Sequence, residues 1–449
     1  MKKLFGTDGI RGVANRELTP ELALRIGKIT ASLLGREEKQ PLILIGRDTR
    51  LSGPMLEGSL VAGIASAGAT ARLLGIAPTP AVAYLTRFLG AAAGIVISAS
   101  HNPIEDNGIK IFNRDGFKLP DEMEMEIERI YFHYDELGAG LPCPEGAAVG
   151  CVEHDDELWE RYLQYLKSTA ASLEGLRLVV DCGHGAACRS ARAVLEQLGA
   201  EVFVIHGEGD GGRINVRCGA TDTAALQCEV VSRGAHAGLA FDGDADRLIA
   251  VDEKGNEVDG DAILAICALD MIRQGRLQKN TLVATVMSNG GLELLGEKHG
   301  FSLRRTAVGD RYVLEEMLAG GYNLGGEQSG HVIFLDHATT GDGLLTALQL
   351  LKVMREAGRP LSELAGQLER LPQVLYNQSV ATKEGWDSNE AIASAIESLR
   401  SRLGRYGRVL VRPSGTEPKI RIMIEAPLPE DKLWEEARQL AEIIAREQG

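Results

Sequence analysis

The same order of predicted strands and helices occurs three times along this chain. In the first copy, short apolar runs alternate with helical patterns, and the last run leads directly into a polar loop. Strands that alternate with helices in this way are typical of parallel βαβ units. The first copy has strands at 42–46, 69–74 and 94–98 and helices near 53–68 and 79–88.

The second and third copies repeat this order. The predicted strands are 176–181, 201–205 and 237–241 in the second copy and 281–287, 302–306 and 322–325 in the third. The predicted helices are 186–198 and 223–233, then 291–299 and 310–319. An antiparallel edge hairpin follows each loop (109–119, 248–258 and from 332), and a further helix follows each hairpin (near 121–131, 261–273 and 343–357). Because ligands bind at the carboxyl ends of strands in open α/β sheets, we expect the three loops to face one cleft.

The last part of the chain does not follow this plan. It has an extended run at 378–382, helices at 388–402 and 431–446, and strands at 407–412 and 419–426, which predict a small α+β domain. The predicted fold class is therefore α/β, with three similar α/β domains of mixed, mostly parallel sheets plus a C-terminal α+β domain, arranged around a central cleft. The expected domains are 1–155 with the serine loop, 156–255 with the aspartate loop, 256–370 with a glutamate loop and 371–449 with an arginine loop.

The composition excludes several classes of protein. Hydrophobic residues make up 44% of the chain and charged residues 25%, as in ordinary globular proteins. A net charge of -15 disfavours nucleic acid and anionic membranes as partners. No run reaches the ~18 apolar residues of a membrane span, and no apolar run follows the basic opening, so we expect no signal peptide. Seven cysteines without a C-x-x-C pair favour reduced thiols and a cytoplasmic location.

Three aspartates, Asp242, Asp244 and Asp246, alternate with small residues directly after an apolar run. Carboxylates at every second position of a tight turn can converge on one hard divalent cation. An EF-hand is disfavoured because no glutamate occupies position 12 and the flanks are typical of strands. Zinc is disfavoured because no Cys/His cluster is near in sequence, and a solvated acidic turn is the remaining alternative. Arg247 follows and supplies a positive charge for a phosphoryl group, so we predict one Mg²⁺ ion here.

Ser100 lies among small residues directly after a predicted strand, so its hydroxyl can be exposed in a tight turn. A phosphorylated serine carries about two negative charges near pH 7 and needs a cation and basic partners. Three aspartates and one phosphoserine oxygen fit the coordination that Mg²⁺ prefers, which makes Ser100 a fourth expected metal ligand. Arg11 and Arg247 can contact the phosphoryl oxygens. A loop serine with local hydrogen bonds is the alternative.

His101 and Lys110 are the candidates for proton transfer beside this serine. His101 follows it directly, and Lys110 begins the next predicted strand. The N-terminal run Phe5-Gly6-Thr7-Asp8-Gly9-Ile10-Arg11-Gly12 is too rich in glycine for a core strand. We expect it to wrap the cleft and to present Thr7, Asp8 and Arg11 there.

Two further loops predict contacts with a sugar phosphate. Glu327 and Ser329 lie between glycines, and their side chains can bind vicinal hydroxyl groups, whereas His331 is interpreted as structural. The turn Arg412-Pro413-Ser414-Gly415-Thr416-Glu417-Pro418 is a candidate phosphate nest, with a plain hairpin turn as the alternative. Arg421 lies on the face of its strand opposite Ile420, Ile422 and Ile424, from which it can reach the same anion.

The chain resembles the α-D-phosphohexomutase superfamily along its whole length. The resemblance depends on an ordered set of motifs: F-G-T-D-G-I-R-G, S-A-S-H-N-P, D-G-D-A-D-R, G-E-Q-S-G-H and R-P-S-G-T-E-P. Within the superfamily, I-S-A-S-H-N-P-I-E-D-N-G-I-K, V-G-D-R-Y-V and T-T-G-D-G are most similar to the bacterial phosphoglucosamine mutases. Many members have glycine where Ala245 stands, and the extra methyl group should be tolerated if the backbone angle there is ordinary.

This resemblance implies roles for the residues already singled out. It implies that Ser100 is the phosphoserine and that Asp242, Asp244 and Asp246 bind Mg²⁺. It also implies that Glu327 and Ser329 contact sugar hydroxyls, while the non-reacting phosphate is bound by Arg412, Ser414, Gly415, Thr416 and Arg421.

The expected reaction is the interconversion of glucosamine 6-phosphate and glucosamine 1-phosphate through a phosphoserine enzyme and a bisphosphorylated sugar, which also serves as activator. A phosphomannomutase/phosphoglucomutase with the same mechanism is the nearest alternative. A catalytically silent sugar-phosphate sensor and a magnesium phosphatase are more distant ones. The expected partners are a hexose phosphate, no nucleic acid and no membrane, with a homodimer as a candidate assembly.

Overall fold

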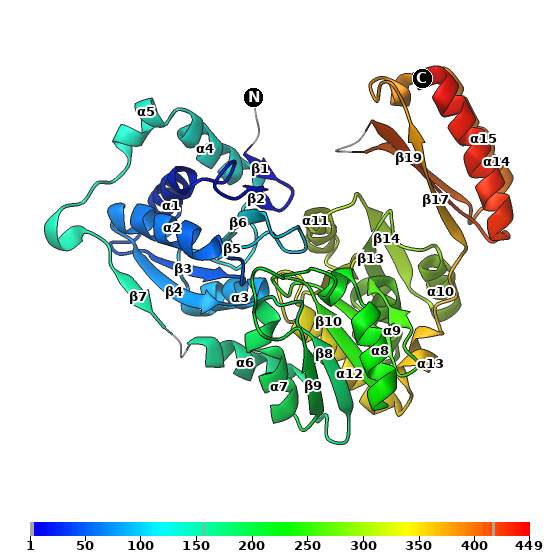
Figure 1. The fold of residues 1–449 in the computed structure, drawn as a ribbon, viewed down its shortest axis with the longest axis horizontal. Helices are drawn as coiled ribbons and strands as arrows, with labels where there is room; N and C mark the ends of the chain where they lie inside the picture. The colour runs from blue at the N-terminus through cyan, green and yellow to red at the C-terminus, as the bar shows by residue number, and fades with distance from the viewer. Residues whose placement is uncertain (1–3, 156–157, 415–417) are drawn as a thin grey trace. The chain divides into compact units, whose positions relative to one another are not determined.

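The computed structural model describes residues 4–155, 158–414 and 418–449, which form two compact units. The larger unit contains the chain through Met287 together with Phe301–Gln367, and the smaller contains Ser288–Gly300 and Leu368–Gly449. The described residues form three sheets in the larger unit and one in the smaller (Figure 1). The four-domain boundaries expected from the sequence stay a prediction.

The three sheets of the larger unit share one core topology. In each, three parallel strands are followed by a fourth that pairs antiparallel with the last of them, in the orders β4-β3-β5-β6, β9-β8-β10-β11 and β14-β13-β15-β16. This shared order confirms the prediction of similar α/β domains with mixed, mostly parallel sheets. The strands are β3 (Leu42–Arg47), β4 (Thr70–Ile76), β5 (Ala93–Ile97), β6 (Asp106–Asn113), β8 (Arg177–Asp181), β9 (Glu201–Ile205), β10 (Ala237–Phe241), β11 (Leu248–Asp252), β13 (Thr281–Thr285), β14 (Ser302–Thr306), β15 (Leu324–Gly326) and β16 (Val332–Phe334).

Helices cover the first sheet on both faces. The largest apolar core lies between one face and the helices α1 (Pro20–Leu34), α2 (Gly53–Ser66) and α4 (Asp121–Phe132), while α3 (Thr79–Leu89) packs on the other face (Figure 1). Glycines let α1 and α2 approach closely: a Cβ at Gly63 would lie 2.0 Å from the carbonyl oxygen of Leu24. Helix α1 was not among the predicted elements, although Thr19 caps it and Pro20 occupies its first position.

Most helices of the second and third sheets match predicted ranges, but α6 (Leu158–Thr169) and α13 (Leu361–Ala365) were not predicted. The others are α7 (Ala191–Gln197), α8 (Ala224–Arg233), α9 (Gly260–Arg273), α11 (Asp310–Gly320) and α12 (Gly343–Ala357). The predicted helix 186–198 is divided into a short 3₁₀ turn, Ala186–Arg189, and α7. Helix α10 (Gly291–His299), predicted within the third repeat, groups with the smaller unit. No described helix has both the length and the apolar character needed to cross a lipid bilayer.

The N-terminal motif forms a hairpin at the end of the first sheet. Strands β1 (Phe5–Gly6) and β2 (Gly9–Val13) pair with each other, and β2 pairs antiparallel with β6. The glycines are tolerated because this hairpin ends the sheet and Gly9 has a φ of 80°. A Cβ at Gly9 would lie 2.5 Å from the carbonyl oxygen of Ile109, so the turn between β1 and β2 lies close against β6.

The smaller unit is an α+β domain, as predicted. Its antiparallel strands have the order β17-β19-β18, with β17 at Gln373–Ser379, β18 at Arg408–Pro413 and β19 at Lys419–Glu425. Alternate side chains of β19, Ile420, Ile422 and Ile424, are buried in a core shared with α14 (Glu390–Leu403) and α15 (Glu430–Gln448). The extended run predicted at 378–382 lies earlier in the chain, because β17 pairs with β19 along residues 373–379.

The loop after β10 lies where the three α/β modules meet. Its backbone carbonyls accept hydrogen bonds from Thr79 N at Asp244 (3.0 Å) and from Gly343 N at Ala245 (3.0 Å). On its far side, Leu248 N donates to the carbonyl of Gly330 over 3.0 Å. Backbone hydrogen bonds therefore join the aspartate loop to the start of α3, to the start of α12 and to the glutamate loop, independently of side chains.

Candidate active site

The hydroxyl group of Ser100 points at the aspartate loop. Ser100 follows β5, is 1% exposed, and its Oγ donates a 2.5 Å hydrogen bond to Oδ2 of Asp242. The Nδ1 atom of His101 lies 3.3 Å from the same Oγ. The structure thus brings the predicted nucleophile and the predicted metal loop into direct contact.

The backbone of Ser100 is held in an uncommon conformation. Its φ angle is 52°, in the left-handed region that non-glycine residues rarely adopt. The Ser100 N–H donates to Oγ of Ser98 (2.9 Å), and Oγ of Ser98 in turn donates to Asp48 (2.6 Å). The Ser100 carbonyl accepts hydrogen bonds from Arg50 (3.0 Å) and from Asn215 Nδ2 (2.8 Å). These contacts over-determine the turn, as a strained residue at a functional site requires.

Arg50 holds the backbone of the serine loop in place. The sequence left the role of Arg50 ambiguous. Its side chain is fully buried and forms an ion pair with Asp48 at 3.0 Å. Its guanidinium group donates to the carbonyls of Ser100 (3.0 Å), Asn102 (2.7 Å) and Asp106 (2.9 Å), and also to that of Pro103. The run Gly46-Arg47-Asp48-Thr49-Arg50 carries no local signal for this role, because the carbonyls lie about 50 residues away.

The three aspartates of the metal loop are buried and close together. Asp242 and Asp244 are fully buried and Asp246 is 5% exposed, and one carboxylate oxygen from each lies within 4.8 Å of the others. The Oδ1 atoms of Asp244 and Asp246 are buried without a hydrogen-bond partner among the described residues. Buried carboxylate oxygens without donors require a cation, so this donor set fits the metal ion that the sequence predicts.

The charges of the triad differ between its members. Burial, followed by the negative charges of Asp246 and Asp244, raises the pKa of Asp242 well above its usual value. Burial also opposes ionisation of Asp244, but the ammonium group of Lys110 outweighs it and lowers the pKa of Asp244. Without a cation, then, the carboxyl group that faces Ser100 is the one that tends to retain a proton.

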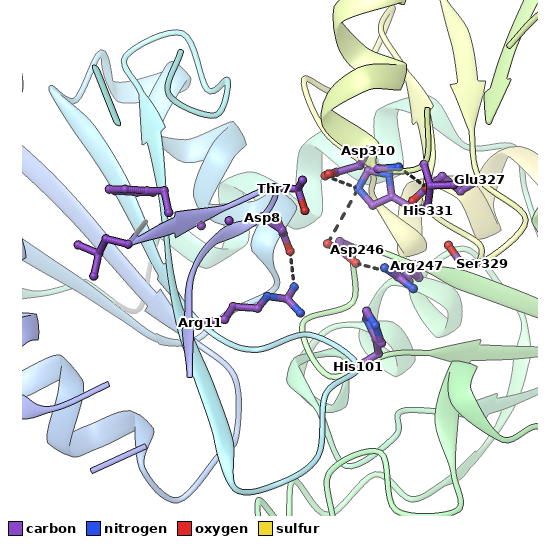
Figure 2. Close-up of a pocket in the computed structure, with 16 residues that line it drawn as sticks. Thr7, Asp8, Arg11, His101, Asp246, Arg247, Asp310, Glu327, Ser329 and His331 are labelled. Carbon is purple, nitrogen blue, oxygen red and sulfur yellow. Dashed lines mark hydrogen bonds and ion pairs between the residues drawn. The ribbon is translucent and has the colours of Figure 1, made fainter. Parts of the chain in front are cut away.

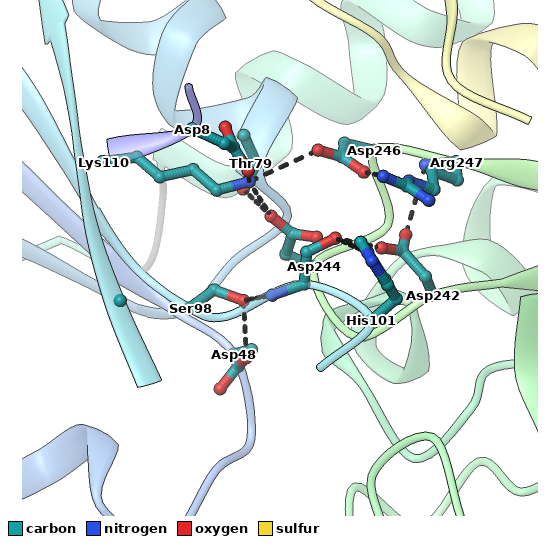
Figure 3. A network of polar contacts seen from close by, with 12 residues as sticks. Asp8, Asp48, Thr79, Ser98, His101, Lys110, Asp242, Asp244, Asp246 and Arg247 are labelled. Atoms are coloured by element: carbon teal, nitrogen blue, oxygen red, sulfur yellow. Dashed lines mark hydrogen bonds and ion pairs between the residues drawn. The ribbon is translucent and has the colours of Figure 1, made fainter. Parts of the chain in front are cut away.

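Lys110 links the N-terminal hairpin to the metal loop (Figure 3). Its Nζ atom lies 2.8 Å from Asp244, 3.0 Å from Asp8 and 3.4 Å from Asp246. Burial acts to lower the pKa of Lys110, but these three carboxylates raise it well above the usual value. Lys110 is therefore a fixed positive charge in this arrangement, and it is a weak candidate for the proton acceptor.

His101, in contrast to Lys110, has a lowered pKa. Burial, followed by the charges of Arg247 and Arg11, lowers its pKa to about 4. The ring is therefore neutral near pH 7, with Nδ1 beside the hydroxyl of Ser100. Of the two predicted candidates, His101 is the one in the protonation state of a general base.

A cavity of about 800 Å³ opens beside these residues. Figure 2 shows Thr7, Asp8 and Arg11 on one side of it and Asp310, Glu327 and His331 on the other. The cavity also reaches His101, Asp246, Arg247 and Ser329, so the N-terminal motif lines the site as expected. A second cavity of about 600 Å³ shares His101, Arg247 and Ser329 with it.

The predicted arginines point toward this space. Arg11 contacts Asp8 and donates to Oδ1 of Asn102 over 2.9 Å, and the backbone N–H of Arg247 donates to Asp242 over 3.2 Å. The Arg247 side chain is 21% exposed, with its Nε 3.8 Å from Asp246. Both guanidinium groups are thus placed to contact an anion in the cavity, as the sequence predicted for a phosphoryl group.

Glu327 and Ser329 follow β15 and face the same cavity. Oε1 of Glu327 accepts a hydrogen bond from Gly309 N over 3.1 Å, which orients the carboxylate. His331 also lines the cavity, and its Nε2 atom lies 3.5 Å from Asp310 and 3.9 Å from Asp246. Neither ring nitrogen of His331 has a hydrogen-bond partner among the described residues, but the ring is buried and packs against Gly341, so its structural role stays a prediction.

Two residues without a role predicted from the sequence are Asp310, which lines the cavity, and Lys118, which contacts Asp310. Lys118 Nζ lies 2.5 Å from Asp8 and also contacts Asp310, so it joins the N-terminal hairpin to the start of α11. The partners are 110 and 192 positions away in the chain, and no local pattern indicates them.

The predicted phosphate loop belongs to the smaller unit. Arg412 and Arg421 face each other in the register of β18 and β19, and Arg421 Nη2 lies 3.5 Å from Oγ of Ser414. Two cationic side chains and one hydroxyl therefore share one end of this sheet. Gly415 and Thr416, the other predicted members, lie outside the described residues.

Ala245 occupies a backbone conformation that differs from the expectation. Its φ angle is 57°, and the residue is 2% exposed. The condition on which its extra methyl group was expected to be harmless, an ordinary backbone angle, is therefore not met. A left-handed alanine costs on the order of 1–2 kcal/mol, which the surrounding packing has to offset.

Family models match four successive parts of the chain. The descriptions are phosphoglucomutase/phosphomannomutase alpha/beta/alpha domain I (residues 2–138), domain II (160–255), domain III (259–371) and the C-terminal domain (375–443). The chain belongs to the phosphoglucomutase/phosphomannomutase family. As a member of this family, it is an isomerase of the mutase type.

Relatives of this family member match over their full length. A protein of Moorella thermoacetica called phosphoglucosamine mutase is 55% identical over 95% of this chain and 96% of its own length. Another with that name, from Geobacillus thermodenitrificans, is 52% identical over the whole of both chains. A solved phosphoglucomutase/phosphomannomutase family protein from Burkholderia thailandensis has a TM-score of 0.82 at 23% identity, covering 99% of this chain and 98% of its own. That likeness shows that the fold is shared.

Proposed function

We propose that this chain interconverts glucosamine 6-phosphate and glucosamine 1-phosphate through a phosphorylated Ser100 and a bisphosphorylated sugar. The observation that carries the proposal is the 2.5 Å hydrogen bond from Ser100 Oγ to Asp242, beside a cavity lined by cationic, carboxylate and hydroxyl side chains. The choice of an amino sugar is supported by full-length relatives with the name phosphoglucosamine mutase, 51–55% identical to this chain.

The first half-reaction moves one phosphoryl group from the protein to the sugar. The bond between phosphorus and Ser100 Oγ breaks, and a bond forms between phosphorus and the free hydroxyl oxygen of the sugar phosphate. The sugar hydroxyl proton leaves for the neutral Nδ1 of His101, which lies 3.3 Å from Ser100 Oγ. The same nitrogen gives a proton to Ser100 Oγ as that oxygen leaves, so the serine hydroxyl is restored. In the second half-reaction the bisphosphate is reversed, and its other phosphoryl group returns to Ser100.

Fixed positive charges surround the transferred group in this proposal. Arg11 and Arg247 contact its oxygens, while Lys110 balances the carboxylates beneath it. The transferred group spreads negative charge over its oxygens in the transition state, which these preorganised donors stabilise.

The aspartate triad and Ser100 together would bind one Mg²⁺ ion. Magnesium takes oxygen ligands and retains phosphate contacts, which suits three carboxylates and one phosphoserine oxygen. When bound, the ion supplies neutralisation of charge on the phosphoryl oxygens. The unpartnered Oδ1 atoms of Asp244 and Asp246 support this assignment.

The sugar and the non-reacting phosphate have separate proposed contacts. Glu327 and Ser329 bind sugar hydroxyl groups. Arg412, Ser414 and Arg421 bind the phosphate that does not react, together with Gly415 and Thr416. A phosphate site that accepts either end of the sugar allows the bisphosphate to react twice at one serine.

A coupled assay tests the reaction. The full-length chain, with Mg²⁺ and a trace of sugar bisphosphate, is given glucosamine, glucose and mannose 6-phosphates, and formation of each 1-phosphate is followed. We expect the highest kcat/KM for the glucosamine compound. A clear preference for glucose or mannose would instead assign the phosphomannomutase/phosphoglucomutase activity that the family description also covers, and release of free phosphate without isomer would assign a phosphatase.

The proposed assembly of this chain is a homodimer. Size-exclusion chromatography with light scattering distinguishes a homodimer from a monomer of 48.2 kDa.

A further inference from the structure

Three side chains of different chemistry converge at the carboxyl edge of the second sheet, outside the proposed reaction. They are Asp181 at the end of β8, His206 directly after β9, and Cys218 in the loop that leads to α8. One ligand atom from each lies within 4.8 Å of the others. Asp181 and Cys218 are buried, whereas the His206 side chain is 29% exposed.

The ligand atoms of this Asp181–His206–Cys218 cluster lie close together, and two of them already contact each other. Oδ1 of Asp181 accepts the N–H of Gly183 over 2.9 Å, which leaves Oδ2 facing Nδ1 of His206 at 3.0 Å. The Cys218 Sγ atom lies 3.8 Å from the carbonyl oxygen of Arg213. An oxygen, a nitrogen and a sulfur donor are therefore available in one small volume.

The backbone under the cluster is closely packed. Gly219 follows Cys218 with a φ of 66°, and a Cβ there would lie 2.4 Å from the carbonyl oxygen of Phe241 and 3.0 Å from Cα of Gly183. Gly183 itself has a φ of 54°. Because no larger residue fits between these chains, Cys218 and Asp181 are kept close to each other.

We propose that Asp181, His206 and Cys218 bind a divalent cation of the zinc class, with a fourth position open to solvent through His206. Thiolate, imidazole and carboxylate are the protein ligands of zinc, and three of them with an open position are a known arrangement for that ion. Donors about 2.0–2.3 Å from one tetrahedral ion are about 3.3–3.8 Å from one another. On binding, the pair at 3.0 Å therefore opens slightly, and any separation near the 4.8 Å limit closes.

Binding at this cluster exchanges a proton for the metal ion. The thiol proton leaves to solvent when the sulfur donates its electron pair to the ion.

The cluster differs from the aspartate triad in its donor atoms and in the part of the chain that it holds. The triad offers oxygen atoms only, which suit magnesium, whereas a sulfur and a nitrogen donor select a softer ion. His206 and Cys218 also bound the loop that contains Asn215, whose Nδ2 atom supports the carbonyl of Ser100 at 2.8 Å. An ion at the cluster would consequently fix both ends of a segment that holds the serine turn.

Titration of the full-length chain with Co²⁺, in excess Mg²⁺ to occupy the triad, tests the proposal. A cobalt–thiolate bond gives a charge-transfer band in the near ultraviolet that no carboxylate site produces. We expect this band to saturate at one equivalent of Co²⁺ and to disappear when Zn²⁺ is added. A wild-type chain without the band, or with a band that Zn²⁺ does not displace, would overturn the site.

Variants assign the band to the cluster. Cys218→Ala should remove it, and His206→Gln should weaken Co²⁺ binding by about tenfold or more. Cys267→Ala removes another buried thiol and should leave the band unchanged. A band that survives Cys218→Ala would contradict the proposal. If that variant does not fold, the partly exposed His206 still decides the question, because unchanged affinity in His206→Gln would also contradict it.

Discussion

Ser100 Oγ donates a 2.5 Å hydrogen bond to Oδ2 of Asp242, a residue 142 positions later in the chain. This contact joins the serine turn, which follows β5, to the aspartate loop, which follows β10. Each loop begins at the carboxyl end of its strand. The proposed phosphoserine position and the proposed metal ligands therefore contact each other, as the proposed metal-assisted phosphoryl transfer needs.

Ser100→Ala should lower the isomerisation rate by more than about a thousandfold, because it removes the atom that carries the phosphoryl group. Binding of the sugar phosphate, measured by calorimetry, should persist because the cavity residues stay in place. Ser232→Ala removes an exposed hydroxyl on α8 and serves as the matched control. Substantial turnover in Ser100→Ala would refute the assignment of the nucleophile.

Mg²⁺ should raise the melting temperature of the wild-type chain. Three buried carboxylates repel one another, and a cation that binds only the folded state stabilises it by about 2.7 kcal/mol at one hundred times its Kd. Asp246→Asn should reduce both this shift and the activity, whereas Asp135→Asn, outside the site, should change neither. Differential scanning fluorimetry with and without EDTA measures the shift, and an equal Mg²⁺ response in Asp246→Asn would count against the triad.

Arg50→Lys should disturb the conformation of the serine turn, although Arg50 is not among the proposed substrate contacts. The variant keeps a positive charge near Asp48 but loses most of the hydrogen bonds to the carbonyls of residues 100–106. Loss of these buried bonds should cost about 2–4 kcal/mol of unfolding free energy and lower kcat. Arg47→Lys, whose side chain is 20% exposed and pairs with Glu57, should have a much smaller effect in the same urea titration. Comparable losses in the two variants would show that Arg50 has no special role.

Ala245→Gly should increase stability by about 0.5–1 kcal/mol. Glycine removes the cost of a left-handed backbone at φ 57°, and this gain exceeds the entropy that glycine loses on folding. Ala240→Gly, in the buried strand β10, should destabilise the chain instead. Urea unfolding of both variants gives the signs, and a destabilised Ala245→Gly would mean that the buried methyl group contributes more than the strain costs.

Asp342 should make the chain less stable as the pH rises from 4 to 6. Burial raises its folded pKa to about 6 from 3.8, although Tyr162 and Leu345 N donate to it. In that window the folded state binds more protons than the unfolded state, so stability is lost with rising pH and levels off above 6. Asp342→Asn should remove about 1 kcal/mol of this change between pH 5 and 6, as measured by urea unfolding at each pH. An unchanged pH profile in the variant would exclude Asp342 as its source.

The sequence predicted the repeating modules because strands, helices and turns depend on neighbours within a few residues. The runs before Ser100, Asp242 and Glu327 are apolar and short, and each precedes a polar loop, so both the strand and its functional end could be located. The alternation of Asp242, Asp244 and Asp246 predicted a common ligand position for the same local reason. Helices α1 and α6 were missed although Thr19 and Asp155 accept backbone hydrogen bonds at their starts.

Tertiary structure decided what depends on distant parts of the chain. The roles of Arg50, Lys118 and Asp310 arise from partners between 50 and 192 positions away, whose approach is fixed by the packing of whole modules. Likewise, the charge of His101 and Lys110 depends on burial and on carboxylates that only folding brings near. Local sequence thus determined which residues could do the chemistry, and long-range packing decided their conformation, protonation and neighbours.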